Sequence, residues 1–140
     1  KQKMFLMQEQ KIIYTHNTPQ LSPEELKHQF KITTVETSID ALAIWEKTTS
    51  TDRIELAEKS KVWTISIDNG TLRTRSLDKY LDLEKIPDNP RWRNVVKTCH
   101  FILSNEGLLV SDRSRLEHQL DAVLEQVKQL SLASNQAQNN

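Results

Sequence analysis

The stretch that decides the fold is residues 62–77, VWTISIDNGTLRTRSL. Two runs of strand-forming residues flank Asn69-Gly70, a pair typical of the two-residue type I′ hairpin turn. With that turn, the strands pair in a defined register: Asp68 with Thr71, Ile67 with Leu72, Ser66 with Arg73, Ile65 with Thr74, Thr64 with Arg75 and Trp63 with Ser76. The sequence therefore predicts an antiparallel β-hairpin.

The predicted register gives the hairpin one apolar and one polar face, because directly opposed residues lie on the same face. The large apolar residues share one face: Trp63, Ile65, Ile67 and Leu72. The polar face carries Arg73 and Arg75. A shift of one residue would mix the two faces, so the pattern itself favours the two-residue turn. We expect helices to pack on the apolar face.

Five elements are expected before the hairpin. Residues 22–25, Ser-Pro-Glu-Glu, are typical of a helix N-terminus, with a capping serine followed by proline at the first helical position. Residues 32–37, ITTVET, are rich in β-branched side chains and predict a strand. The full set is a strand over residues 11–15, a helix over 23–30, a strand over 32–37, a helix over 39–48 and a short helix capped by Asp52.

Helices are also expected after the hairpin. One short helix is predicted around residues 77–83, and the helix at 90–104 has apolar residues that step by three and four. Gly107 is expected in the left-handed conformation that often ends a helix. Residues 108–110 predict a short strand, and Ser111 or Ser114 starts a long C-terminal helix.

A chain of 140 residues suits one domain. We predict a single α+β domain over residues 1–132, with a small, mainly antiparallel sheet that contains the hairpin at about 62–77. Several helices pack on this sheet. Residues 133–140 are Ser, Gln, Asn and Ala, and we expect a polar, flexible tail there.

The composition restricts the compartment and the partners. The chain has 19 Lys and Arg and 19 Asp and Glu, so no field from the whole chain attracts nucleic acid or an anionic membrane. No apolar run is long enough for a membrane span. Cys99 is the single cysteine, which fits a reducing compartment. We expect a cytoplasmic protein, or a nuclear one if it is eukaryotic, without membrane contact.

Positive charge is nevertheless concentrated in one part of the chain. Residues 71–100 hold seven Lys or Arg and four acids. The candidate binding residues on the hairpin and on the helix at 90–104 are Arg73, Arg75, Arg91, Arg93 and Lys97. This pattern predicts a surface for nucleic acid or for an acidic protein partner. The alternative is a solvated face on which Asp78, Asp82 and Glu84 neutralise the neighbouring cations.

The C-terminal helix carries apolar residues in a 4,3,4,3 rhythm: Leu116, Leu120, Val123, Val127 and Leu130. This rhythm is typical of a coiled coil, and it predicts self-association as a homodimer. It lasts only about two heptads, which favours packing of the helix on its own domain.

Catalytic signatures are missing from the sequence: it has no nucleophile motif, phosphate-binding loop or metal-ligand spacing. We therefore predict a non-catalytic interaction module of a larger protein or assembly, with no metal or other cofactor. One alternative is a metal-dependent, nucleic-acid-processing enzyme that uses Glu36 and Asp68 at strand ends. A second alternative is a purely structural dimerisation domain that uses the helix at 114–131.

Overall fold

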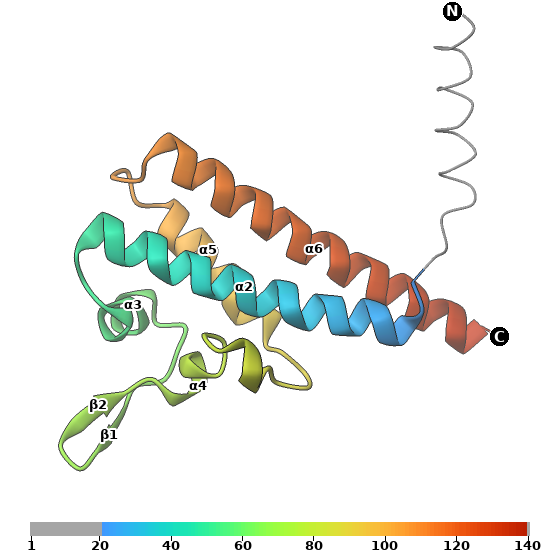
Figure 1. Ribbon diagram of the computed structural model, residues 1–140, viewed down its shortest axis with the longest axis horizontal. Coiled ribbons are helices and arrows are strands. Elements are labelled where there is room, and N and C mark those ends of the chain that lie inside the picture. Colours follow the sequence, from blue (N-terminus) through green and yellow to red (C-terminus); the bar gives the residue numbers. More distant parts are fainter. Residues whose placement is uncertain (1–20, 140) are drawn as a thin grey trace, which may run out of the picture.

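Helices build most of the fold, and one two-stranded antiparallel sheet completes it (Figure 1). This computed structural model describes residues 21–139, so the strand predicted at 11–15 lies outside the described part. The elements are α2 (Pro23–Thr49), α3 (Arg53–Ser60), β1 (Ser66–Asp68), β2 (Thr71–Arg73), α4 (Arg75–Asp78), the 3-10 helix η1 (Leu83–Lys85), α5 (Trp92–Leu103) and α6 (Val110–Asn139). The predicted α+β class, with a central hairpin and a long C-terminal helix, is confirmed.

The two long helices, α2 and α6, lie side by side and antiparallel (Figure 1). Three sets of polar contacts join them at steps of seven residues along each helix. Gln126 Nε2 donates to Thr33 Oγ1 at 3.1 Å, and the Lys47 ammonium lies 2.7 Å from the Asp112 carboxylate. Midway between them, Asp40 accepts hydrogen bonds from Arg115 and Gln119. The regular step shows that the two helices keep one register over about four turns.

An apolar seam accompanies these polar contacts. On α6, the first three residues of the predicted 4,3,4,3 seam are buried: Leu116, Leu120 and Val123. On α2, the buried residues include a set with the same rhythm: Phe30, Thr34, Thr37, Ala41 and Ile44. In the register above, the two seams face each other, so α2 is the partner that the α6 seam requires.

The strand predicted at residues 32–37 is wrong, because these residues lie within α2. Thr34, Val35 and Thr37 are fully buried in the helix that contacts both α5 and α6. The hydroxyl of Thr34 donates to the Phe30 carbonyl at 2.7 Å, which satisfies it inside the helix. A β-branched residue costs a helix only about 0.5 kcal/mol relative to good helix formers, so burial on this scale outweighs local preference.

The third packed helix, α5, contacts both α2 and α6. Its buried residues are those of the predicted apolar stripe, Val95, Cys99 and Ile102, together with Thr98. The core lies between α2, α5 and α6 and extends to the buried residues of α3, α4 and the hairpin segment: Leu56, Ala57, Trp63, Leu77 and Tyr80. The described helices include none that is long and apolar enough to cross a membrane.

The hairpin has the predicted register: Ser66 with Arg73, Ile67 with Leu72 and Asp68 with Thr71. Asn69 and Gly70 have φ angles of 53° and 78°, as a type I′ turn requires. The strands, however, are only three residues long. We predicted that helices pack on the whole apolar face of the hairpin. This is wrong at the tip, where Ile67 and Leu72 are exposed, whereas Trp63 at the base is buried. Figure 1 shows the hairpin projecting away from the helices.

Three local predictions near the later helices also need correction. The helix expected around 77–83 is two shorter pieces, α4 and η1. Residues 108 and 109 are irregular and Val110 begins α6, so the strand predicted at 108–110 is wrong. Gly107 does not have a positive φ; its N–H instead donates to Asn105 Oδ1 at 2.7 Å in a tight turn. Helix α6 continues through residues 133–139, and the domain limit at residue 132 stays a prediction.

Candidate nucleic-acid interface

The base of the hairpin is attached to α5 by buried contacts. The Trp63 indole N–H donates to Thr98 Oγ1 at 2.8 Å, and the Trp63 ring packs on Tyr80 with centroids 5.2 Å apart. The Tyr80 hydroxyl in turn accepts a hydrogen bond from the backbone N–H of Arg91. These contacts hold the chain from the hairpin to α4 against the N-terminal half of α5, where Arg91, Arg93 and Lys97 are located.

All five predicted binding residues have exposed side chains: Arg73, Arg75, Arg91, Arg93 and Lys97. On α5, Arg93 and Lys97 are four residues apart and therefore lie on the same side of the helix. The Arg93 guanidinium lies 4.4 Å from the centre of the Trp92 ring, which holds its charge at the surface through a cation–π contact.

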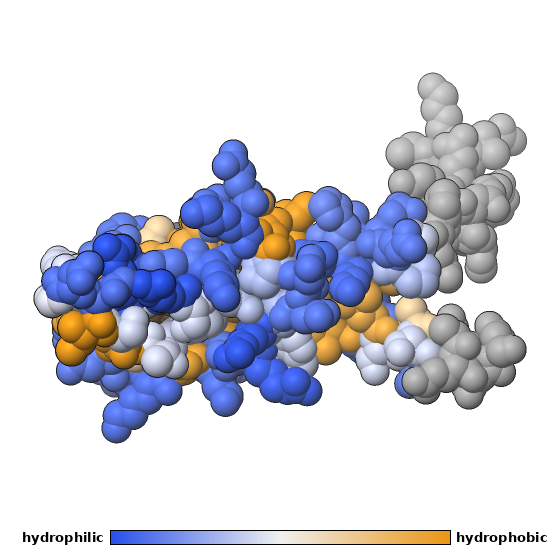
Figure 2. Space-filling view, turned by 90° about the horizontal axis from the view of Figure 1, so that it is seen from below, coloured by the Kyte–Doolittle hydropathy of each residue, from blue (hydrophilic) through white to orange (hydrophobic). Residues whose placement is uncertain are grey.

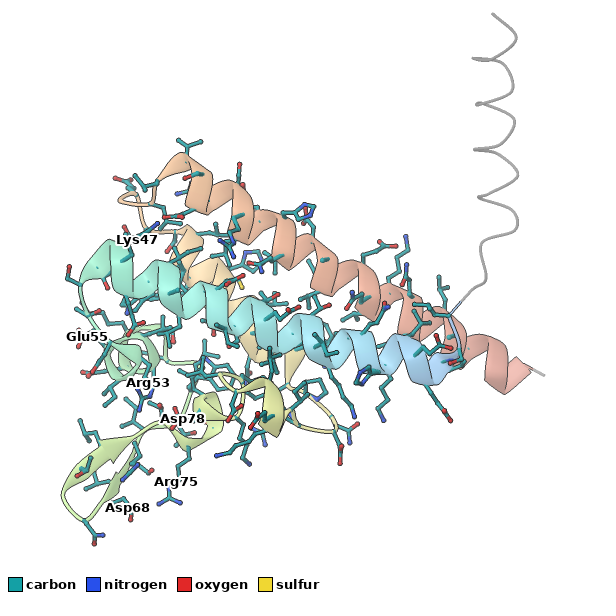
Figure 3. All side chains as sticks on the ribbon, in the orientation of Figure 1. Lys47, Arg53, Glu55, Asp68, Arg75 and Asp78 are labelled. Carbon is teal, nitrogen blue, oxygen red and sulfur yellow. The ribbon has the colours of Figure 1, made fainter. Side chains whose placement is uncertain are left out.

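Arg75 differs from the other four, because it already has an acidic partner. Its guanidinium forms an ion pair with the Asp68 carboxylate of the hairpin, and Figure 3 shows the two side chains near each other. The predicted strand pairing of Arg75 with Thr64 is wrong, since Arg75 is the first residue of α4. Much of its charge is therefore neutralised within the hairpin.

In the described part of the chain, the acids between residues 71 and 100 form no ion pair with the cations of the same segment. Asp78 pairs with Arg53 of α3 at 3.0 Å, as Figure 3 shows, and Asp88 pairs with Lys31 of α2 at 3.4 Å. Within residues 21–139, six cationic side chains of the segment have no acidic partner: Arg73, Lys79, Lys85, Arg91, Arg93 and Lys97. We call these six the unpaired cations. All six are exposed, so the positive charge read from the sequence remains at the surface.

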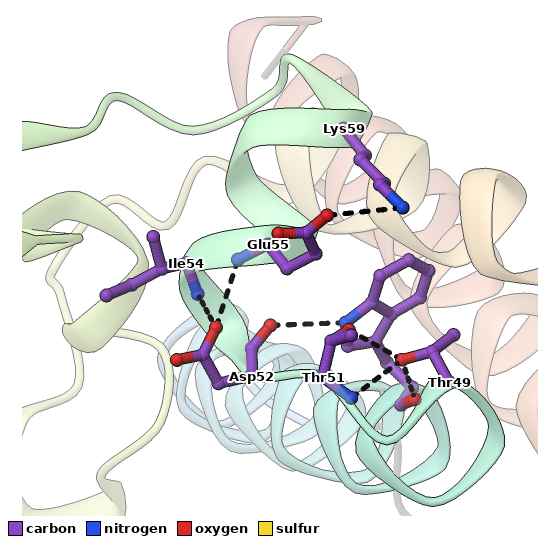
Figure 4. A network of polar contacts seen from close by, with 7 residues as sticks. Thr49, Thr51, Asp52, Ile54, Glu55 and Lys59 are labelled. Atoms are coloured by element: carbon purple, nitrogen blue, oxygen red, sulfur yellow. Dashed lines mark hydrogen bonds and ion pairs between the residues drawn. The ribbon is translucent and has the colours of Figure 1, made fainter.

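A second candidate surface is the helix–turn–helix that α2 and α3 form. Only Ser50, Thr51 and Asp52 separate the two helices, and Figure 1 shows α3 lying across the end of α2. The Asp52 carboxylate caps α3 by accepting from Ile54 N and Glu55 N at 3.1 Å each (Figure 4). The sequence predicted the C-terminal half of α2 as a helix over 39–48, the loop after it and α3, and the short turn with its cap was the signal that identifies the motif.

The charges around this turn do not suit a phosphate backbone. The open hollow beside it is lined by Glu46, Asp52 and Glu55 together with Ser50 and Thr51. Glu55 pairs with Lys59 of the same helix at 3.2 Å. Carboxylates at the surface repel phosphate, so the unpaired cations form the more favourable interface.

The residues proposed for self-association lie mainly within this chain's own core. Leu116, Leu120 and Val123 are buried against the domain, whereas Val127 and Leu130 are half-buried. The short length of the seam had favoured this packing of the helix on its own domain. A homodimer through this helix stays a prediction, and the side chains still exposed along α6 include Leu124 and Leu132.

The residues of the metal-dependent alternative do not form a site. Glu36 is exposed on α2, and Asp68 lies on the hairpin, where it binds Arg75. The strand end that would have carried Glu36 is helix, so the expected geometry of two strand-end carboxylates is wrong. The described part of the chain contains no cluster of three or more His, Cys, Asp or Glu suited to a metal ion.

No protein-family model and no curated protein sequence matches this chain. Among solved structures, the chain is similar to the crystal structure of the DNA-binding domain from the sensor histidine kinase ChiS of Vibrio cholerae. The two are 31% identical, and they superpose with a TM-score of 0.70. The match covers 75% of this chain and 98% of the ChiS domain. This chain therefore belongs to the same family as the ChiS DNA-binding domain.

Proposed function

We propose that this chain is a non-catalytic DNA-binding module of a larger protein and that it contacts phosphates through the unpaired cations. The observation that carries this proposal is the ion-pair pattern of residues 71–100. Asp78 and Asp88 pair with cations of other elements, and six exposed cations remain without an acid in the described chain. Membership in the family of the ChiS DNA-binding domain supports DNA as the partner.

The electrostatics explain how a chain with zero formal charge can bind a polyanion. Lys and Arg side chains that reach phosphates release condensed counterions, and this term depends on the local surface and not on the total charge. An acidic row on the outer side of α6 would turn the molecule away from DNA on that side: Glu117, Asp121 and Glu125. The charge distribution thus favours one orientation of the domain on a duplex.

On α5, Arg93 and Lys97 are the central phosphate contacts of this proposal. They are exposed on the same side of the helix, and Arg91 precedes them at the N-terminal end. The Trp63–Thr98 and Tyr80–Arg91 contacts join the chain on either side of the hairpin to the same helix, and the proposal adds Arg73 from the hairpin between them. A phosphate surface made from a helix and a two-stranded ribbon is an established way to position a protein on DNA.

The test is binding of a short labelled duplex and the corresponding single strand over a series of salt concentrations. We expect salt-dependent binding of the wild-type chain. Arg93→Gln and Lys97→Gln should each weaken binding on any sequence and reduce the slope of log affinity against log salt by about 1. Lys128→Gln on α6 is the matched control, because Lys128 is also exposed and is outside the proposed surface. Absence of salt-dependent binding at low ionic strength would overturn the proposal.

The setting of the module follows from the same proposal. A DNA-binding module acts where DNA is accessible, which is the cytoplasm of a bacterium or the nucleus of a eukaryote. Self-association through the helix at 114–131 would place two modules on neighbouring DNA sites. Sedimentation of the chain with and without the duplex distinguishes a monomer from a homodimer.

A further inference from the structure

The tip of the hairpin exposes an apolar pair that the helical core does not use. Ile67 and Leu72 lie directly opposite each other on the two strands, and their exposed fractions are 74% and 46%. The usual arrangement for a hairpin in a soluble domain is an apolar face packed on the core. Here the pair extends into solvent beyond the buried base at Trp63 and Thr74. A pair held on a projecting ribbon is available to a partner.

The ribbon is pre-formed. Asn69 and Gly70 adopt the positive φ angles of the tight turn, and the Asp68–Arg75 ion pair joins β1 to the start of α4. At the base, the buried Trp63 hydrogen bonds to α5. A two-stranded hairpin alone is marginal, so the tight turn and the buried base at Trp63 are what support its shape. Pre-organisation lowers the ordering cost when the hairpin binds.

The charges around the apolar pair favour a polyanion with apolar walls. Arg73 follows Leu72 directly and has no acidic partner in the described chain. Asp68 is the one acid of the hairpin, and Arg75 neutralises it. Figure 2, which views the domain from the side on which the hairpin projects, shows a mainly hydrophilic face broken by hydrophobic patches. A groove of duplex DNA offers this combination, because two rows of phosphates flank the apolar surface of the sugars and base edges.

We propose that the hairpin tip enters the minor groove of DNA, with Ile67 and Leu72 against the sugars and base edges. This inference rests on the proposed function. The turn residues Asn69 and Gly70 are small and uncharged, which suits entry into a groove about 6 Å wide. Apolar side chains act as wedges in the minor groove, and arginine is attracted by its negative potential. Arg73 is the residue placed for that second role.

The experiment uses two labelled duplexes that are identical except that one carries inosine–cytosine pairs in place of guanine–cytosine pairs. Inosine lacks the 2-amino group, which projects only into the minor groove, so the major groove is unchanged. The wild-type chain should bind the inosine duplex several-fold more tightly. The double variant Ile67→Ala, Leu72→Ala should lose this preference and bind about tenfold more weakly with an unchanged salt slope, because it removes apolar contacts and no charge.

Leu124→Ala on α6 is the matched control, since Leu124 is 40% exposed and lies away from the hairpin. The double variant and the Leu124→Ala control both change exposed side chains, so urea unfolding should give the same free energy of unfolding for these variants and the wild type. Equal affinity of the wild-type chain for the two duplexes would overturn the inference. A double variant that binds DNA with wild-type affinity would overturn the inference too. The proposed function would still hold in that case if Arg93→Gln and Lys97→Gln weaken the salt-dependent binding. No binding of either duplex by the wild-type chain would overturn both. A wild-type dimer that the double variant converts to a monomer would assign the pair to self-association and overturn the inference.

Discussion

Trp63 Nε1 donates a hydrogen bond of 2.8 Å to Thr98 Oγ1, and both side chains are buried. The Thr98 hydroxyl donates its own proton to the Asn94 carbonyl at 2.7 Å, so its lone pair is available to the indole. The two residues are 35 positions apart and belong to the hairpin segment and to α5. One buried hydrogen bond therefore connects the hairpin segment, which carries Arg73, to the helix that carries Arg93 and Lys97.

Thr98→Val should lower the free energy of unfolding by about 1–3 kcal/mol, because it leaves the buried Trp63 N–H without an acceptor. Urea denaturation followed by tryptophan fluorescence measures this loss. Thr64→Val is the control, since Thr64 is exposed next to Trp63, and its effect should stay within about 0.5 kcal/mol. Equal effects of the two substitutions would contradict the role assigned to the hydrogen bond.

Leu116→Ala should cost about 2–5 kcal/mol of stability, because the side chain is fully buried in the seam with α2. The loss should be the same at all protein concentrations, since the seam lies within one chain. Leu124→Ala, at a half-exposed position on the same helix, should have a small effect. A stability that rises with protein concentration would show instead that the seam holds two chains together.

Asp68→Asn should strengthen DNA binding at low salt several-fold. The substitution removes the acid that neutralises Arg75 and so adds one cation to the proposed surface. The salt slope should become steeper by about 1. Stability should change by less than about 1 kcal/mol, because the ion pair is partly exposed. Asp121→Asn on the outer side of α6 removes the same charge elsewhere, and equal strengthening by both variants would point to net charge and not to the hairpin.

Burial raises the pKa of the Cys99 thiol from 9.0 to about 12. The unfolded chain releases this proton near pH 9 whereas the folded chain keeps it, so the contribution to stability is complete below pH 9 and is lost as the pH rises toward 12. The slope of the loss is at most about 1.4 kcal/mol per pH unit. Urea unfolding of the wild type and of Cys99→Ala over alkaline pH measures it, and parallel curves for the two proteins would refute it.

Local rules predicted the parts of the fold that depend on neighbouring residues. The Asn69-Gly70 turn and the strand register followed from hairpin chemistry, and the caps at Ser22 and Asp52 marked the starts of α2 and α3. The apolar stripe of α5 likewise predicted its buried side. The exposed cations could be identified in the same way, because charge and helical spacing are visible in the chain itself.

The ion-pair partners were not predictable, because they come from distant elements. One alternative left Asp78 to neutralise neighbouring cations, but its partner is Arg53, and Asp88 binds Lys31. Which cations remain unpaired depends on how α2 and α3 pack against the segment. The sequence showed an excess of positive charge, and the tertiary structure decided which side chains carry it.

The apolar seam of the C-terminal helix also separates what the sequence determines from what only the tertiary structure decides. The sequence by itself determined that residues 116–130 carry a 4,3,4,3 apolar rhythm and need a second helix to cover it. Only the tertiary structure decided that this helix is α2, whose β-branched run at 32–37 favours a strand when considered alone. The physical reason is that burial of Val35 and of the methyl groups of Thr34 and Thr37 against the other helices outweighs the small local cost of a helix at these residues.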